Sequence, residues 1–159
     1  MITLDQVLSG RNILRAIKQV VSNKGAPGID GMTVDQYEAH HRRHWRSIAE
    51  HIRAGSYIPT VQDRVIQQAI AQILVEAYDP HFSNSSYGFR PGRSALEAIE
   101  QASRYIKEGK NWVVEMDLEK FFDTVNHDRL MARLAKRIKD KALLKLIGRY
   151  LRNGIMQNG

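Results

Sequence analysis

The sequence contains no cysteine, so disulfide bonds and thiolate metal sites are excluded. No apolar run approaches the roughly 20 residues that a membrane-spanning helix needs. The first residues, Met-Ile-Thr-Leu-Asp, lack the basic and apolar regions of a signal peptide. A Walker phosphate loop and a Gly-x-Ser-x-Gly nucleophile elbow are also absent. These absences favour a cytoplasmic protein with no membrane partner.

Positive charge is in excess. The chain has 24 Lys and Arg against 17 Asp and Glu, which gives a formal net charge of +7. Such a balance favours polyanionic partners, nucleic acid first and anionic membrane surfaces second. The length of 159 residues suits one ordinary domain or a piece of a larger protein.

Apolar residues recur at helical spacing along most of the chain. Capping pairs mark several helix starts, with Thr33 before Gln36, Thr60 before Asp63 and Ser94 before Glu97. We therefore predict helices over residues 11–23, 33–55, 60–79 and 94–109, followed by one that Asn126 caps and one that Asp140 opens.

Three segments leave alternatives open. The run Gly25-Ala-Pro-Gly-Ile-Asp-Gly31 is either a plain turn or a loop whose N–H groups hold a phosphate. The cluster His40, His41 and His44 invites a metal interpretation, although a solvated or phosphate-facing helix is the commoner meaning. Residues 81–93 are rich in Arg and aromatics, which suits either phosphates and stacked bases or a loop whose rings pack inward.

The stretch from Trp112 to His127 organises the rest of the chain. Its apolar start, Trp-Val-Val-Glu-Met, predicts a short buried strand that ends at Asp117. A carboxylate in such a place needs a partner, and a metal ion is one candidate. Pairing with an arginine or capping of a helix is the alternative. Asp123 and Asp128 follow, and neither is an obvious second ligand from spacing alone.

Three motifs together resemble the reverse transcriptase of bacterial group II introns, the intron-encoded protein that also acts as a maturase. The first is Gly25-Ala-Pro-Gly-Ile-Asp-Gly-Met-Thr33. The second runs from Ile58-Pro-Thr-Val-Gln-Asp-Arg64 to Ser86-Tyr-Gly-Phe-Arg-Pro-Gly-Arg93. The third is Met116-Asp-Leu-Glu-Lys-Phe-Phe-Asp-Thr-Val-Asn-His127. Retron, diversity-generating and CRISPR-associated reverse transcriptases share parts of this pattern, and the first two motifs favour the intron type.

The resemblance implies an α+β, mostly helical chain that forms an incomplete fingers-palm region of a right-hand polymerase. Residues 1–57 would be the N-terminal extension and the start of the fingers. Residues 58–110 would be fingers and palm helices with the template-handling loop, and residues 111–159 a partial palm.

The resemblance also implies roles for single residues. Asp117 looks like the first catalytic aspartate and a ligand of Mg²⁺, for which Mn²⁺ can substitute, with the Leu118 carbonyl as a backbone ligand. Phe122 falls where the family has its aromatic gate beneath the sugar of the incoming nucleotide. A ring there excludes a 2′-hydroxyl and so selects deoxynucleotides. Nucleic-acid contacts are implied for Arg64, Arg90, Arg93, Asp30 and Gly31.

Two departures from the family pattern matter. Tyr57 runs directly into Ile58-Pro59, where the family usually has a basic fingers hairpin that holds the triphosphate. The sequence also stops before the family's Tyr-Ala-Asp-Asp strand, which carries the paired aspartates of the metal site. We therefore expect the parent protein to be an RNA-directed DNA polymerase and this chain to be inactive alone.

The expected partners are template or intron RNA, a DNA primer and deoxynucleoside triphosphates. Unpaired sheet edges would favour a homodimer, for which light scattering is the test. The competing class is a non-catalytic RNA-binding splicing cofactor, because maturase work does not need the aspartates.

Overall fold

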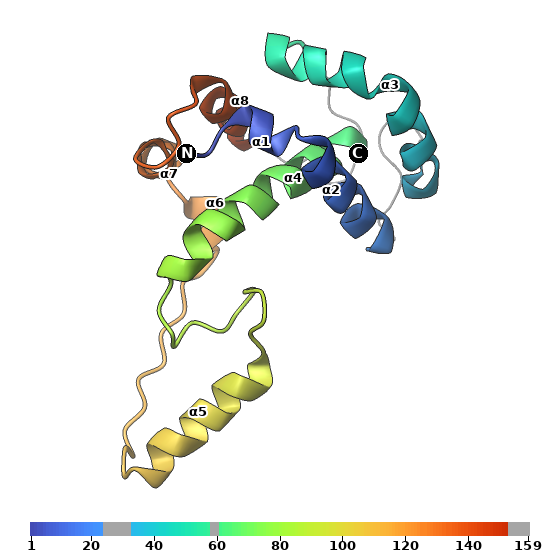
Figure 1. Ribbon diagram of the computed structural model, residues 1–159. Coiled ribbons are helices and arrows are strands. Elements are labelled where there is room, and N and C mark those ends of the chain that lie inside the picture. Colours follow the sequence, from blue (N-terminus) through green and yellow to red (C-terminus); the bar gives the residue numbers. More distant parts are fainter. Residues whose placement is uncertain (24–32, 58–60, 153–159) are drawn as a thin grey trace. The chain divides into compact units, whose positions relative to one another are not determined.

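The computed structural model describes residues 1–23, 33–57 and 61–152, which are mostly helical (Figure 1). A single isolated parallel bridge between Ile2 and Ile138 is the only β pairing among these residues. The α-helices are α1 (Leu4–Val7), α2 (Gly10–Ser22), α3 (Val34–Ala54), α4 (Val61–Tyr78), α5 (Ala95–Lys107), α6 (Phe121–Thr124), α7 (His127–Ala135) and α8 (Lys141–Arg152), and a 3-10 turn, η1, covers Asp79–His81.

The predicted helices are confirmed to within a few residues because their start signals act locally. The Gln36 side chain accepts a hydrogen bond from the Thr33 N–H at 3.1 Å, which closes the capping box of α3. The Ser94 N–H donates to the carboxylate of Glu97 at 2.7 Å, and the reciprocal bond is also present. The predicted pair Thr60 and Asp63 lies partly outside the described residues.

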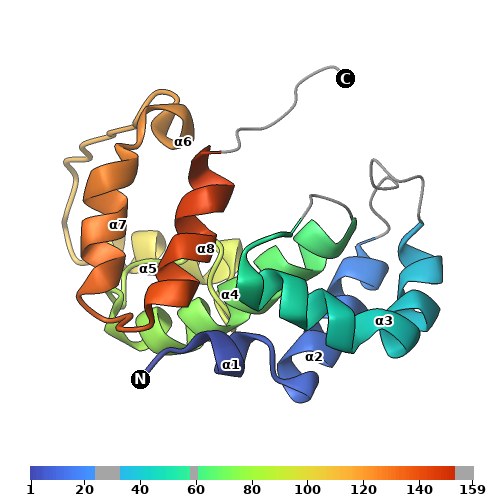
Figure 2. The ribbon, with the colours of Figure 1, turned by 90° about the horizontal axis from the view of Figure 1, so that it is seen from above.

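The chain divides into two compact units, Met1–Val75 with Asn126–Gly159 and Glu76–Val125. The functional segments expected from the resemblance, 1–57, 58–110 and 111–159, stay a prediction. The first unit holds the apolar core, and α7 and α8 lie side by side within it (Figure 2). Its most deeply buried large side chains come from α1, α2, α4 and α8 and from the turn before α8: Val7, Ile13, Ile17, Val65, Ile66, Ile138 and Leu143.

A buried asparagine links three segments of the first unit. The Asn12 side-chain amide donates to the carbonyls of Val7 at 2.9 Å and Ala69 at 3.0 Å. Its Oδ1 accepts from the Gln72 amide at 2.8 Å. Because each of these groups would be costly to bury alone, Asn12 fixes how α1, α2 and α4 fit together.

The helix α3 ends at Gly55, a position whose backbone conformation favours glycine. Gly55 has a φ of +73°, the left-handed region that side chains disfavour. A Cβ at this position would also lie 2.9 Å from the Arg149 guanidinium, which donates to the Gly55 carbonyl. The ring of Tyr57 meets Tyr150 edge-on nearby, so the end of α3 is joined to α8.

The histidine cluster on α3 is not a metal site in the part of the chain that the structure describes, where no three His, Cys, Asp or Glu side chains converge. His41 is buried and its ring lies against Trp45, with ring centroids 4.7 Å apart. Desolvation lowers the pKa of His41, His40 lowers it further, and Glu38 opposes both. His41 therefore belongs to the core, and His40 and His44 are ring neighbours at 4.5 Å.

The predicted buried strand over residues 112–116 is wrong for this structure. Residues 110–118 form an extended trace without β pairing (Figure 1), and Trp112 is 97% exposed. A strand satisfies its N–H and C=O groups only against a neighbouring strand. The described residues supply no such neighbour, so the run stays extended and solvated. The mostly helical part of the expected fold class is confirmed.

None of the described helices combines the length and apolar character needed to cross a membrane.

Asp140 holds the N-terminal segment onto the start of α8. Its Oδ2 accepts from the Leu4 N–H at 2.8 Å, and its Oδ1 accepts from Ala142 at 2.9 Å and Leu143 at 3.1 Å. The bond from Leu4 is the largest cause that lowers the pKa of Asp140, partial desolvation opposes it, and the bonds from Leu143 and Ala142 add to the lowering.

We predict that Asp140→Ala lowers the free energy of unfolding by about 1 kcal/mol at neutral pH, the usual cost of losing a helix cap. A lowered folded-state pKa means that the stabilisation is complete above the unfolded value of about 3.9 and disappears as the pH falls through the folded value. Urea unfolding followed by circular dichroism at a series of pH values measures this. Asp128→Ala, in the first turn of α7, is the matched control, and a difference that persists undiminished in acid would contradict the prediction.

Candidate functional site

A tight turn builds the candidate site in the second unit. Lys120 has a φ of +48°, and its carbonyl accepts hydrogen bonds from the N–H groups of Asp123 at 3.0 Å and Thr124 at 3.1 Å. The Thr124 hydroxyl also donates to the Lys120 carbonyl at 3.1 Å. A left-handed non-glycine residue is unusual and is often retained where function requires it. The turn bends the chain sharply after Asp117.

This bend brings Asp117, Phe122 and Asp123 around one open hollow of about 640 Å³. The Leu118 N–H donates to Asp117 Oδ1 at 2.8 Å, which leaves Oδ2 available to a ligand. Leu118 lines the same hollow. Two carboxylates and a backbone carbonyl are oxygen donors of the kind that Mg²⁺ prefers. Spacing alone left Asp123 undecided, and in the structure it lines the same hollow as Asp117.

Phe122 projects from the same turn and is 87% exposed. Its ring meets that of Phe121 edge-on, with centroids 5.7 Å apart. An exposed ring beside a carboxylate offers a flat apolar surface next to a charged one, which suits a nucleotide's sugar and phosphates.

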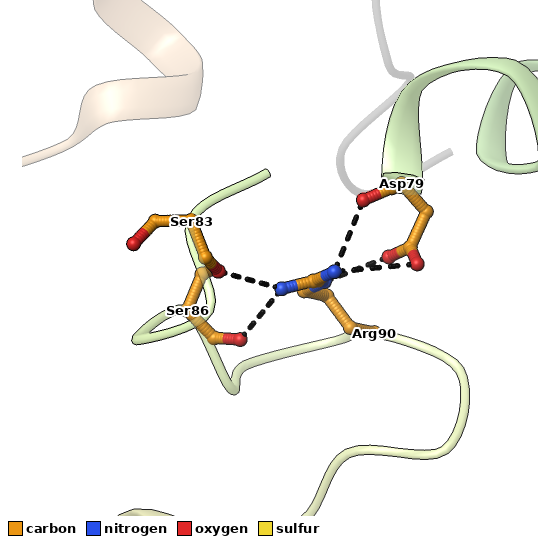
Figure 3. Close-up of polar contacts among 4 residues, drawn as sticks. All are labelled: Asp79, Ser83, Ser86 and Arg90. Atoms are coloured by element: carbon orange, nitrogen blue, oxygen red, sulfur yellow. Dashed lines mark hydrogen bonds and ion pairs between the residues drawn. The ribbon is translucent and has the colours of Figure 1, made fainter. Parts of the chain in front are cut away.

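Arg90 organises the loop that precedes α5 (Figure 3). Its Nε donates to Asp79 Oδ1 at 2.7 Å, and its Nη2 donates to Asp79 Oδ2 at 3.3 Å and to the Asp79 carbonyl at 3.0 Å. Its Nη1 donates to the carbonyls of Ser83 at 2.8 Å and Ser86 at 2.9 Å. The guanidinium therefore uses all three nitrogens within the loop, and its side chain is only 9% exposed.

Asp79 and Arg90 each favour the charged form of the other. The hydrogen bond from Arg90 is the largest cause that lowers the pKa of Asp79, and the charges of Arg90 and Arg93 add to it against partial desolvation. The same hydrogen bond raises the pKa of Arg90. Arg90 thus acts on the shape of the loop, and its predicted nucleic-acid contact stays a prediction.

The two phenylalanine rings of the loop face solvent, so the inward-packing interpretation of residues 81–93 does not hold for them, and the nucleic-acid interpretation stays a prediction. Phe82 and Phe89 are exposed, and Tyr87 is half-buried. The Arg93 guanidinium lies over the Tyr87 ring at 5.3 Å from its centroid. The loop is therefore anchored by Arg90 rather than by inward-packing phenylalanines.

The other residues predicted to contact nucleic acid are not part of the Arg90 loop or the Asp117 hollow. Arg64 is half-buried in the first unit, where it lines a hollow of about 280 Å³ with Asn23, Gln67 and Gln68. Asp30 and Gly31 lie outside the described residues. Sequence reasoning missed the role of Asp79, whose Asp-Pro dipeptide signalled only the end of a helix. The available signal was a single acid, Asp79, at the start of a loop that also carries two arginines.

Comparison with known proteins identifies the class. Residues 36–159 match the family described as reverse transcriptase (RNA-dependent DNA polymerase), and the chain belongs to this family. The match includes most of α3, all of α4 to α8, the Arg90 loop and the Asp117 hollow.

Relatives of the chain include intron-encoded proteins and an intron maturase. The chain is 30% identical over 165 residues to the group II intron-encoded protein LtrA of Lactococcus lactis, which covers 90% of this chain and 27% of LtrA. It is 39% identical over 93 residues to the putative COX1/OXI3 intron 2 protein of Saccharomyces cerevisiae, covering 58% of this chain and 11% of that protein. It is 36% identical over 89 residues to nuclear intron maturase 1 of Arabidopsis thaliana, covering 56% of this chain and 12% of that protein. The matched part of the chain thus spans about a quarter or less of the length of each of these three relatives.

We predict that Arg90→Lys opens the loop, because an ammonium cannot reproduce the guanidinium fork that reaches Asp79, Ser83 and Ser86 together. Amide hydrogen exchange over residues 82–93 should accelerate roughly tenfold, as expected when charged hydrogen bonds are lost. Arg93→Lys is the matched control, since the Arg93 side chain contacts the Tyr87 ring rather than the loop carbonyls that Arg90 binds. Equal protection in both variants would refute the anchoring role.

Proposed function

We propose that this chain is the fingers and part of the palm of a group II intron reverse transcriptase, an α+β region whose parent copies RNA into DNA. The observation that carries the proposal is the shared hollow of Asp117, Phe122 and Asp123 within the family match. In the parent, the reaction adds a deoxynucleotide to a primer 3′-hydroxyl by in-line displacement at the α-phosphate.

Asp117 and Asp123 would hold a divalent metal ion, Mg²⁺ or Mn²⁺, with the Leu118 carbonyl as a further oxygen donor. These oxygen donors fit such an ion, because Mg²⁺ takes one or two carboxylates and keeps water and substrate phosphates as its other ligands. A bound ion would neutralise phosphate charge and favour ionisation of the attacking hydroxyl. The two carboxylates give the open hollow negative charge, and Lys120 adds one positive charge to its lining.

Phe122 would select the nucleotide. Its exposed ring lies in the same hollow as Asp117, so a triphosphate held at the carboxylates would place its sugar near the ring. A ribose with a 2′-hydroxyl would then collide with the ring, and deoxynucleoside triphosphates would be preferred.

By itself, the chain should not extend a primer. Two-metal catalysis needs several carboxylates at one point, and in residues 1–23, 33–57 and 61–152 no three His, Cys, Asp or Glu side chains converge. Asp117 and Asp123 would bind one ion weakly and leave the second unsupported.

We predict that Mn²⁺ binding, followed by electron paramagnetic resonance, weakens at least about tenfold in Asp117→Asn. Asp123→Asn should weaken it as well, because its carboxylate faces the same hollow. Glu119→Gln is the matched control, as Glu119 is exposed in the same turn and does not line the hollow.

Equal losses in all three variants would show nonspecific attraction of the cation. Primer extension by the unmodified chain on an RNA template, abolished in Asp117→Ala, would overturn the proposed inactivity of the chain alone.

A second candidate function is RNA binding in intron splicing without polymerisation. It is favoured by the likeness to a nuclear intron maturase and by the net charge of +7. The partner would be intron RNA, bound through phosphate contacts. A homodimer stays a prediction, consistent with the exposed apolar side chains of α5 and residues 112–116.

We predict that affinity for a structured intron RNA falls steeply with salt, by roughly a hundredfold between about 50 and 200 mM, because bound cations are released from phosphates. Fluorescence anisotropy measures it. Arg64→Ala should reduce the slope of log affinity against log salt by about one, while Asp117→Asn should leave it unchanged. A flat salt response would argue against RNA as the partner, and loss of binding in Asp117→Asn would argue against a separate splicing role.

A further inference from the structure

The extended segment between α5 and α6 leaves its backbone without partners in the described part of the chain. Residues 111–117 take part in no backbone hydrogen bond there (Figure 1). Their apolar side chains meet water, with Trp112 97%, Val114 82% and Met116 89% exposed. An unpaired extended segment of this kind is a template onto which another strand can pair.

The segment has the alternation of a strand with one apolar face. In a strand, successive side chains point to opposite faces. One face would carry the apolar residues Trp112, Val114, Met116 and Leu118. The opposite face would carry Val113, Glu115 and Asp117. The first face gains from burial, whereas the second keeps its carboxylates in water. The sequence therefore suits a sheet with one covered face, and it needs a neighbouring strand.

Charge decides how this segment can pair with a copy of itself. In parallel, in-register pairing, Glu115 and Asp117 would each lie beside its own copy, and like charges in direct opposition are destabilising. Antiparallel pairing about Glu115 would again oppose two Glu115 side chains. Antiparallel pairing about Val114 avoids both clashes. It also places Trp112 opposite Met116, a favourable contact between a ring and a sulfur.

We infer that the partner of this segment is the same segment in a second copy of the chain, paired antiparallel about a twofold axis at Val114. Such an interface is isologous, because both copies contribute the same surface. Two strands alone are marginally stable and need a cover. The helix α5 of the same compact unit can supply it through its exposed residues Leu96, Ile99 and Ile106. The inference rests on the homodimer predicted above and not on metal or RNA binding.

The first test places charge on the axis in the full chain, purified free of nucleic acid. Light scattering of the unmodified chain should show a mass that rises towards that of a dimer with concentration. Val114→Glu and Val114→Lys should each weaken dimerisation at least roughly tenfold, because apolar burial is lost and like charges face one another. An equimolar mixture of the two variants should dimerise again, since opposite charges then meet at the axis. Leu14→Glu, at an exposed apolar residue of α2, is the matched control.

Single cysteines map the register, because the chain has none of its own. Directly opposed residues of an antiparallel pair have Cβ atoms close enough for a disulfide. Mild oxidation of Val114→Cys should therefore give a covalent dimer. Lys110→Cys is the matched control, since pairing about Val114 would separate its two copies by roughly 27 Å. Both positions are exposed, so circular dichroism of each variant should match that of the unmodified chain.

Three outcomes would overturn the inference. A monomeric mass at every concentration shows that no second copy binds, and the metal and RNA proposals then stand or fall by their own tests. Dimerisation of Val114→Glu as tight as that of the unmodified chain places the interface elsewhere. Cross-linking of Lys110→Cys as efficient as that of Val114→Cys indicates parallel pairing and refutes the register.

Discussion

The structure is governed by where backbone hydrogen-bonding groups find partners. A helix satisfies these groups within its own sequence, whereas a strand depends on a neighbour. The long helices of this chain form accordingly, and residues 110–118 remain extended and exposed. The same constraint accounts for the apolar side chains of Trp112, Val113 and Val114 that face water. Apolar character alone did not create a strand.

Where distant segments meet, single polar side chains set the geometry. Asn12 joins α1, α2 and α4 by bonding the carbonyls of Val7 and Ala69. Asp140 joins the N-terminal segment to α8. Arg90 performs the same task in the second unit, with Asp79 as its anchor. Hydrophobic burial supplies the driving force for folding, but these directional bonds decide which arrangement of helices and loops is reached.

The residues proposed for function lie on short turns. Lys120 and Phe89 are the non-glycine residues with positive φ in the described part of the chain. The turn at Lys120 gathers Asp117, Phe122 and Asp123 around one hollow, and Phe89 immediately precedes the anchored Arg90. Both lie in the segment shared with reverse transcriptases. The helices thus act as supports, and the chemistry proposed for the parent enzyme resides on the connections between them.

The sequence by itself determined the helices, their caps and the excess of positive charge. Capping boxes such as Ser94 with Glu97 act over three residues, and net charge does not depend on folding, so both can be read directly. The motif around position 117 also predicted a metal-binding role for Asp117, which stays a prediction. The tertiary structure alone decided that residues 112–116 lack a strand partner within the described chain, that Asp123 lines the same hollow as Asp117, and that Arg90 is an anchor. Each of these depends on the path of the chain: Arg90 reaches Asp79 across 11 residues of irregular loop, and no local periodicity encodes that path.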